Sequence, residues 1–382
     1  MVNRGYCEMM LGDAAAALQS FSAALARAPQ LSEAWVGMGD IAAQRNEHGE
    51  ALRCYEQALG IDPGLLVTRN NRAQSLMALG RIKEAWRDSE TRFELPHAAT
   101  LYPHRLALPR WDGRPGARVL VHWEQGFGDI IQHLRFLPRL ADRLGPDGSC
   151  AFECPPPLAA LVRRMPGAPA LITAGNQAPA LPGFDCQAAL LSLPHLLGIS
   201  DDALPQSPYL CADTARAAAL RASWSQGGAC PLVGIAWRAS SFDTRRSVGL
   251  SVVLDAFAAR VQSVAPGVRL VALQKDISTG EQSLLSQRGS IDAGAAFDSF
   301  DDSAAALAAL DSVVCVDTAV AHLAGALGVQ TTLLLNEPAA VRWMLGRTDT
   351  PWYASMRILR KSAEQSWSGL LAQAADMPQV AA

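Results

Sequence analysis

The sequence predicts an α-helical repeat array followed by two α/β halves. In residues 1–96, similar residues recur at a spacing of about 34 positions. From 118 onward, short apolar runs typical of buried strands alternate with longer runs that carry apolar residues at helical spacing, and this alternation starts again at 231. Because strands that alternate with helices predict doubly wound parallel sheets, the expected fold class is α + α/β, with two Rossmann-like halves behind the array.

The composition excludes several classes of protein. The chain has 382 residues, of which 49% are hydrophobic and 18% charged, and its formal net charge is −3. No basic surface is therefore expected, which argues against nucleic acid as a partner. The longest apolar stretch, 313–335, contains Asp317 and His322, so we expect no membrane span. No signal-peptide pattern is present at the N-terminus, and we expect a cytoplasmic protein.

Eight cysteines are scattered along the chain. Only Cys150 and Cys154 lie close together, and no second pair matches them, so we expect no metal site. Thiols within apolar runs act as small core residues and indicate a reducing compartment.

Small, aromatic and proline residues carry the repeat. Ala17, Ala51 and Ala85 share one position of the repeat unit, and Phe21 and Tyr55 share another. The further matching positions are Leu25, Leu59 and Phe93; Pro29 and Pro63; and the small residues Gly5, Gly39 and Ala73. This pattern resembles the tetratricopeptide repeat, a unit of two antiparallel helices in which small residues allow close helix contact.

The array is short and begins partway through a repeat. Met1 aligns with Trp35, so we expect either the tail of a longer array or a misplaced start. Because so few repeats are marginally stable alone, the array should pack on the domain that follows. Two roles stay open for it, a groove that binds a protein partner and a structural cap.

Prolines interrupt the helical pattern after the array. We predict tetratricopeptide repeats at 1–96, a linker at 97–116, a first Rossmann-like half at 117–212 and a second at 231–382. Strands are expected at 118–123, 150–154, 184–188, 232–237, 268–274, 313–316 and 330–335. Helices are expected at 130–140, 158–165, 252–264, 281–288, 303–310, about 364–374, and in a run that ends at Gly328. Ligands of such sheets bind at the carboxyl ends of the strands, so we expect a substrate cleft between the halves.

Two motifs follow strands at positions suited to a ligand. Gly126-Phe127-Gly128-Asp129 comes after the first strand, and Asp317-Thr318 stands between the strand at 313–316 and a helix of small residues. A helix N-terminus has unpaired N–H groups that suit a phosphate. Taken alone, each motif is equally well an ordinary βα turn whose Asp or Thr caps the helix.

Four segments together resemble one family. These are the runs at 124–129, 242–247, 317–324 and 349–353. The runs at 126–129 and 317–324 resemble the heptosyltransferase-like glycosyltransferases (family 9) of GT-B fold. The run at 124–129, together with 242–247 and 349–353, resembles still more the bacterial proteins that fuse tetratricopeptide repeats to such a domain. The resemblance implies an inverting, metal-independent glycosyltransferase that moves a sugar from a nucleotide-sugar donor to an acceptor hydroxyl, with a protein as a candidate acceptor. The nucleotide-sugar is then a substrate, and no cofactor is implied.

The resemblance also implies roles for single residues. Asp129 would be the general base that takes the proton of the acceptor, in a loop formed by Gln125, Gly126 and Gly128 on the acceptor side. The residues expected to bind the donor, on the second half, are Arg245, Arg246, Gln274, Lys275, Glu281, Asp317, Thr318, Ala319 and His322.

Within this donor set the implied contacts differ. Arg245 and Arg246 would hold the diphosphate through their guanidinium groups, and Glu281 would bind the ribose. Thr318 and Ala319 would offer a hydroxyl and backbone N–H groups to the diphosphate, together with Gln274 and Lys275 along the pocket. Asp317 would orient the loop, because two anions repel, and His322 would contact either phosphate or acceptor.

Each role has a structural alternative. Asp129 would cap a helix, the Arg245-Arg246 pair would lie in a solvated loop, Glu281 would be a favourable charge in a first helical turn, and His322 would be packed in the interior. Two aromatic segments near the end, 342–343 and 352–353, either close the cleft or pack in the core.

Two other functions stay open for the whole chain. One is a non-catalytic repeat scaffold whose glycosyltransferase-like domain has lost turnover. The other is an oxidoreductase, which the absence of a G-x-G-x-x-G fingerprint places last.

Overall fold

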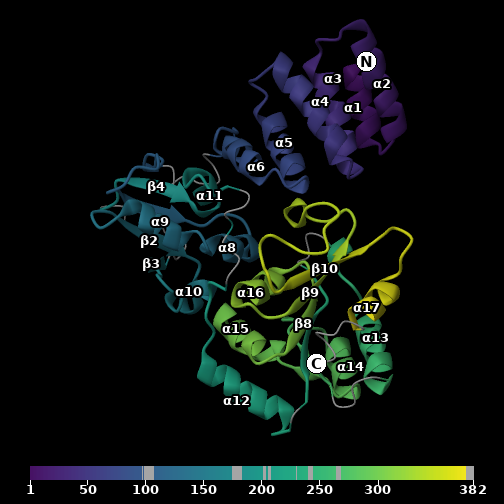
Figure 1. The fold of residues 1–382 in the computed structure, drawn as a ribbon. Coiled ribbons are helices and arrows are strands. Elements are labelled where there is room, and N and C mark those ends of the chain that lie inside the picture. The colour runs from purple at the N-terminus through teal and green to yellow at the C-terminus, as the bar shows by residue number, and fades with distance from the viewer. Residues whose placement is uncertain are drawn as a thin grey trace. The chain divides into compact units, whose positions relative to one another are not determined.

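The computed structural model shown in Figure 1 describes residues 1–96, 98, 107–173, 183–200, 204, 208–228, 230–239, 244–263 and 268–375. Its internal contacts divide the chain into two compact units. The first unit consists of Met1–Ala107, Pro194–Ala203 and Pro338–Gly346, and the second of Leu108–Leu193, Leu204–Glu337 and Arg347–Ala382.

The first unit is a stack of helices, drawn from purple to blue in Figure 1. Its elements are α1 (Val2–Met10), α2 (Ala14–Arg27), α3 (Ser32–Gln44), α4 (His48–Ile61), α5 (Leu66–Ala78), α6 (Ile82–Ser89) and the 3-10 turn η1 (Glu90–Phe93). Successive helices pack in pairs, α1 on α2, α3 on α4 and α5 on α6. This is the helix pairing that the period of about 34 residues predicts.

Small residues set the distance between the helices of the array. A Cβ added to Gly5 would lie 2.7 Å from the ring of Phe21, and one added to Gly39 would lie 2.6 Å from the ring of Tyr55. Gly37 also lies against the ring of Phe21, where a Cβ would lie 2.3 Å away. The glycine and the aromatic ring therefore form one contact that recurs in consecutive repeats, which explains why both positions recur in the sequence.

A segment from far along the chain completes the first unit. The 3-10 turn η6 (Val341–Trp343) packs on α5, and the backbone N–H of Leu345 donates to the carbonyl of Ala78 at 2.8 Å. Trp343 is fully buried there. Its indole therefore packs in the interior, as in the structural alternative for this segment. The sequence had assigned this segment to the second α/β half.

The first half of the second unit carries a parallel sheet. Its strands within the described residues are β1 (Arg118–His122), β2 (Ser149–Cys154), β3 (Ala170–Thr173) and β4 (Cys186–Ala189), in the order β3-β2-β1-β4. Val121 aligns with Phe152 on one side and with Ala188 on the other. The helical elements are α8 (Phe127–Leu134), α9 (Leu137–Leu144), α10 (Pro156–Arg163) and η3 (Leu190–Ser192). The short helix α11 (Leu193–Leu196) follows, and from Pro194 onward it belongs to the first unit.

The predicted linker at 97–116 is described at 98 and from 107 onward. Its end is part of the first half rather than a spacer, because Trp111 donates its backbone N–H to the carbonyl of Gln187 in β4 at 2.8 Å. Gln187 in turn donates to the carbonyl of Pro109 at 2.9 Å.

The second half carries a longer parallel sheet. Its strands are β5 (Leu232–Ala236), β6 (Arg269–Ala272), β7 (Ile291–Asp292), β8 (Ser312–Val316), β9 (Thr331–Asn336) and β10 (Met356–Lys361). Among the described residues they are ordered β10-β9-β8-β5-β6-β7, which in chain order is the 3-2-1-4-5-6 arrangement of a Rossmann sheet. The strand order reverses between β5 and β8, so the ligand crevice of this sheet is expected there.

Helices cover both faces of this sheet, as Figure 1 shows. The helices of this half are α13 (Leu250–Ser263), α14 (Thr279–Gln287), α15 (Phe300–Ala308), α16 (Ala319–Leu327) and α17 (Trp367–Ala375), with the 3-10 turns η4 (Thr244–Arg246) and η5 (Gly294–Ala296). The preceding helix α12 (Thr214–Ser225) packs on α15. Phe257 of α13, Leu285 of α14 and Leu371 of α17 pack with Ile235 and Val314 of the sheet in one apolar core.

Some elements were not expected from the sequence. Strands β3 and β10 fall in short runs that also carry polar residues, and α12 lies between the two predicted halves, at 213–230, where no element was predicted. Asp213 caps α12 by accepting from the backbone N–H of Arg216 at 3.0 Å, a cap signal that the sequence does contain.

Candidate functional site

A cavity of about 320 Å³ opens at the carboxyl ends of β5, β6 and β8, where the strand order of the second sheet reverses. Arg238 follows β5, Gln274 and Lys275 follow β6, and Thr318 follows β8, and all of them line the cavity. Its volume is within the usual range for small-ligand sites. The cavity thus lies where the rule for open α/β sheets predicts a ligand.

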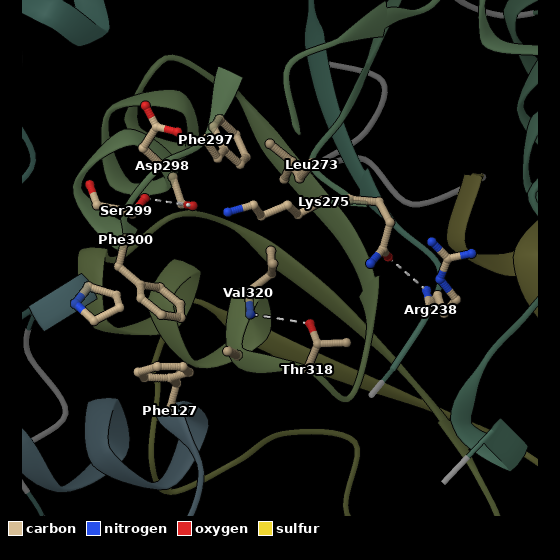
Figure 2. Close-up of a pocket in the computed structure, with 14 residues that line it drawn as sticks. Phe127, Arg238, Leu273, Lys275, Phe297, Asp298, Ser299, Phe300, Thr318 and Val320 are labelled. Atoms are coloured by element: carbon tan, nitrogen blue, oxygen red, sulfur yellow. Dashed lines mark hydrogen bonds between the residues drawn. The ribbon is translucent and has the colours of Figure 1, made fainter. Parts of the chain in front are cut away.

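One side of the cavity is aromatic. Phe127 at the start of α8 and Phe300 at the start of α15 face each other with ring centroids 4.8 Å apart and planes tilted by 53°. Phe297, Leu273 and Val320 add further apolar surface. Figure 2 shows this tilted pair of rings, which come from different halves of the second unit. This side suits a flat or apolar group.

Polar and charged groups, among them Lys275 and Asp298, also line the cavity. The Lys275 side chain extends into the cavity towards Ser299 (Figure 2). Lys275 makes no hydrogen bond or ion pair with another residue that the structure describes. Thr318 caps α16 by accepting from the backbone N–H of Val320 at 3.2 Å, and Ala319 begins the helix beside it. A lysine and a helix N-terminus together favour an anionic ligand group.

Arg238 lies at the rim of this cavity and is held by several partners. Its backbone N–H donates to Oε1 of Gln274 at 3.0 Å, and its Nη2 donates to the carbonyl of Asp276 at 2.8 Å. Its Nη1 lies 3.1 and 3.2 Å from the two carboxylate oxygens of Glu281. Arg238 was not among the residues expected at the site, although a cation directly after a strand at this edge is the signal that could have identified it.

Glu281 does not line the cavity. Its carboxylate accepts from the indole N–H of Trp237 at 2.8 Å and from the backbone N–H of Ser278 at 2.8 Å, in addition to Arg238. Burial raises the pKa of this carboxyl, but the hydrogen bonds from Ser278 and Trp237 and the charge of Arg238 outweigh burial and lower the pKa overall. Ser278 and Glu281 also form a capping box at the start of α14. In this structure Glu281 is therefore an acidic residue in a first helical turn, which is the structural alternative to a ribose contact.

The Gly-Asp turn lies at the N-terminus of α8. Gln125 has φ of 63°, an uncommon value for a residue with a side chain, and is exposed. Gly126 is the N-cap, and Asp129 stands in the first turn, half-buried, with Oδ2 3.6 Å from the position of a Cβ on Gly126. Phe127 of this turn lines the cavity, and Asp129 does not.

The two sequence motifs touch each other. A Cβ on Gly128 would lie only 2.8 Å from Cδ2 of His322, so α8 lies directly against α16 at this point. His322 is 1% exposed, and its Nδ1 lies 2.9 Å from the hydroxyl of Tyr353. Its imidazole is therefore a packing group between the halves, and the structure does not bring it into the cavity.

Arg135, at the end of α8, adds to the same junction. Its guanidinium donates to the carbonyl of Trp352 at 2.5 Å and to the hydroxyl of Tyr209 at 3.2 Å. It also lies 4.8 Å from the ring centroid of Tyr353. Trp352 and Tyr353 are each 1% exposed, so these aromatic residues pack in the core.

The predicted arginine pair does not line the cavity. Arg246 pairs with Asp317, with Nη1 3.2 Å from Oδ2, and Asp317 is 3% exposed. This ion pair holds the loop before α16, and the role of Asp317 in orienting the loop for a donor stays a prediction. Arg245 is exposed, and its carbonyl accepts from Nδ2 of Asn336 at 3.3 Å. Residues 242–243 of the same predicted motif lie outside the described residues.

Of the predicted donor residues, the structure brings Gln274, Lys275, Thr318 and Ala319 together at the cavity. The aromatic lining was not identified from the sequence, because isolated Phe residues carry no periodic signal. Among the residues that the structure describes, no group of three or more His, Cys, Asp or Glu side chains is arranged to hold a metal ion. Within the same residues, no helix has the length and apolar character needed to cross a membrane.

Comparisons with known proteins match both parts of the chain. The family model of the tetratricopeptide repeat matches residues 32–65, which contain the α3–α4 pair. The crystal structure of a glycosyl transferase family 9 protein from Veillonella parvula superposes with a TM-score of 0.50 at 14% identity, over 69% of this chain and 94% of that one. The predicted fold is confirmed: tetratricopeptide repeats followed by an α/β domain of GT-B architecture.

Two further relatives were found. Protein FlbA of Caulobacter vibrioides is 29% identical over 381 residues, which are 91% of this chain and 61% of the relative, so this chain spans about six-tenths of the length of that protein. The ADP-heptose LPS heptosyltransferase II of E. coli superposes with a TM-score of 0.45 at 15% identity, over 64% of this chain and 91% of that one.

Proposed function

We propose that this protein is a glycosyltransferase that moves a sugar from a nucleotide-sugar donor to an acceptor hydroxyl. The observation that carries the proposal is the cavity at the switch point of the second sheet, which is lined both by aromatic rings and by the cationic Lys275. A nucleoside diphosphate combines a flat base, which suits the aromatic rings, with an anionic diphosphate, which suits the lysine. The GT-B fold supports the proposal as an analogy.

The donor would lie across the cavity. Its nucleoside would pack against the apolar side chains of Phe297, Phe300 and Leu273, and its diphosphate would lie beside Lys275 and the N-terminus of α16. The ammonium group and the helix dipole would stabilise the negative charge that grows on the leaving diphosphate. In this arrangement the reaction is independent of a metal ion.

Transfer would proceed with inversion at the anomeric carbon. The acceptor oxygen attacks that carbon as its proton passes to the carboxylate of Asp129, and the bond from the anomeric carbon to the diphosphate oxygen breaks at the same time. Asp129 is a candidate because it lies on the same helical turn as Phe127, which lines the cavity. Gln125, Gly126 and Gly128 would form the acceptor-side loop around it.

The acceptor would be a protein hydroxyl presented by the array. This part of the proposal rests on the tetratricopeptide match and on the packing of η6, which the chain places between β9 and β10 of the α/β domain, against α5 of the array.

The test is sugar transfer by the full chain. Wild-type protein is incubated with a panel of radiolabelled nucleotide-sugars and with proteins co-purified from the source cells, and labelled protein is detected by mass spectrometry and counting. Asp129→Asn should lower the transfer rate by about 10²- to 10⁴-fold while nucleoside diphosphate binding is unchanged. Asp142→Asn, at an exposed carboxylate of α9, is the matched control and should transfer at the wild-type rate.

The outcomes separate the parts of the proposal. Transfer by Asp129→Asn at the control rate would show that another group is the base. Nucleoside diphosphate binding without transfer from any donor would favour the non-catalytic scaffold instead.

A further inference from the structure

The turn after β6 that carries Lys275 is held on both sides by the rest of the domain. We call residues 274–281 the Lys275 turn. Asp276 within it has φ of 56°, the left-handed region that residues with side chains rarely adopt. Such strained positions persist only where the surroundings enforce them, and they concentrate at functional sites.

One side of the turn is held by Gly294. A Cβ at this buried position would lie 2.0 Å from the carbonyl oxygen of Gln274 and 3.2 Å from the backbone nitrogen of Lys275. The backbone of η5 therefore lies directly against the peptide that joins Gln274 to Lys275. No side chain fits between them, so the peptide cannot move towards η5.

The other side is held by Arg238. Its guanidinium donates to the carbonyl of the strained residue Asp276 at 2.8 Å, and Gln274 accepts its backbone N–H at 3.0 Å. Glu281 holds the guanidinium in place, with carboxylate oxygens 3.1 and 3.2 Å from Nη1, and is itself held by the buried Trp237. The chain Trp237–Glu281–Arg238–Asp276 thus fixes the backbone directly after Lys275.

The lysine that this turn presents is unusual for the chain. The sequence contains three lysines against 30 arginines, and one of the three lines the cavity. A lysine is a point charge on a flexible stem, with no planar fork to orient it. The position of its backbone therefore decides how far its ammonium group extends into the cavity. Gly294 on one side and Arg238 on the other fix that position.

We propose that Arg238 and Glu281 are positioning residues that hold Lys275 where its ammonium group meets the diphosphate of the donor. This inference rests on the proposed function and assigns Glu281 an indirect role in place of the ribose contact that the family resemblance implies. Arg238 acts on the ligand through the carbonyl of Asp276 and the backbone of Lys275.

The test is a thermodynamic cycle on the full chain by isothermal titration calorimetry. The ligands are ADP, GDP, CDP, UDP and TDP, followed by the free nucleoside that corresponds to the tightest of them. The variants are Lys275→Gln, Glu281→Gln and their double mutant. Gln at position 281 keeps the capping box of α14, so this variant is expected to fold, and the thermal midpoint checks it. Arg288→Gln, which breaks the surface ion pair with Asp255 in the same half, is the matched control.

The expected result is specific to an indirect role. Lys275→Gln should weaken diphosphate binding about tenfold, which is the loss of one charge-assisted hydrogen bond. Glu281→Gln should weaken it about three- to tenfold, with nucleoside binding unchanged, and the double mutant should bind within about twofold of Lys275→Gln alone. Arg288→Gln should bind like wild type.

Three results would overturn the proposal while leaving the proposed function intact. These are unchanged diphosphate binding by Glu281→Gln, equal losses for nucleoside and diphosphate in that variant, and losses that multiply in the double mutant. Equal losses would indicate a direct ribose contact. Wild-type protein that binds none of the five diphosphates would instead overturn the proposed function, and this inference with it.

Discussion

The contact between Gly128 and His322 joins the two motifs of this chain, and Gly128→Ala tests it. The new Cβ would lie 2.8 Å from Cδ2 of His322, at least about 0.7 Å inside the usual carbon–carbon separation of 3.5 Å. His322 cannot turn away easily, because it is 1% exposed and its Nδ1 is 2.9 Å from the hydroxyl of Tyr353. Helices α8 and α16 must therefore move apart.

The cost follows from two opposing effects. Overpacking of a buried contact lowers the free energy of unfolding by about 1–3 kcal/mol, and replacing a helical glycine by alanine raises it by about 0.5–1 kcal/mol. We therefore expect the free energy of unfolding of the α/β domain to fall by about 1–2 kcal/mol, which lowers the thermal midpoint by about 2–8 °C.

The assay is scanning calorimetry of the full chain, with near-ultraviolet circular dichroism as a second probe. Gly369→Ala in α17 is the matched control, because its Cβ would meet nothing closer than Ser366 Oγ at 3.5 Å, and it should leave the midpoint unchanged or raise it. Combining Gly128→Ala with His322→Ser should recover about 1 kcal/mol relative to the sum of the single changes. A Gly128→Ala midpoint equal to or above that of Gly369→Ala would refute the close contact.

Three further predictions concern the array, the first half and the cavity. Gly37→Ala places a Cβ 2.3 Å from Phe21, so the free energy of unfolding of the array should fall by about 1–3 kcal/mol, measured by urea denaturation followed by far-ultraviolet circular dichroism. Burial lowers the pKa of His133 to about 4, so between pH 6.5 and 4 the unfolded chain binds a proton that the native chain does not. Stability should therefore fall as the pH falls through this window, by about 3 kcal/mol in total, and His133→Gln should remove that part of the pH dependence of urea midpoints. Phe127→Leu removes the ring that faces Phe300 at 4.8 Å and should weaken nucleoside diphosphate binding about three- to tenfold by calorimetry, whereas unchanged binding would exclude Phe127 from the ligand site.

The sequence predicts the fold well where the same contact recurs or where strand and helix periods are clear. Gly39 and Tyr55 appear at repeating positions because each repeat needs the same close approach of two helices. The strand before Asp317 and the small-residue helix after it are strong local signals, and the structure has β8 and α16 at those places. Residue periodicity within a short segment is sufficient to predict such elements.

The site is less predictable, because a polar side chain can be satisfied either by a ligand or by its own chain. Glu281 fits the pattern of a ribose ligand in sequence, yet Trp237 and Arg238, more than 40 positions away, occupy its carboxylate in the fold. The facing pair Phe127 and Phe300 arises only when the two halves meet. Neither contact can be predicted from the local sequence, because each joins residues that are far apart along the chain.

The most direct test of the central claim is a calorimetric titration of nucleoside diphosphates into the full chain. We predict that at least one of them binds with one site per chain, and that Lys275→Gln and Phe300→Leu each weaken that binding. Failure of every nucleoside diphosphate to bind, or binding that neither substitution changes, would contradict the assignment of this cavity as the donor site.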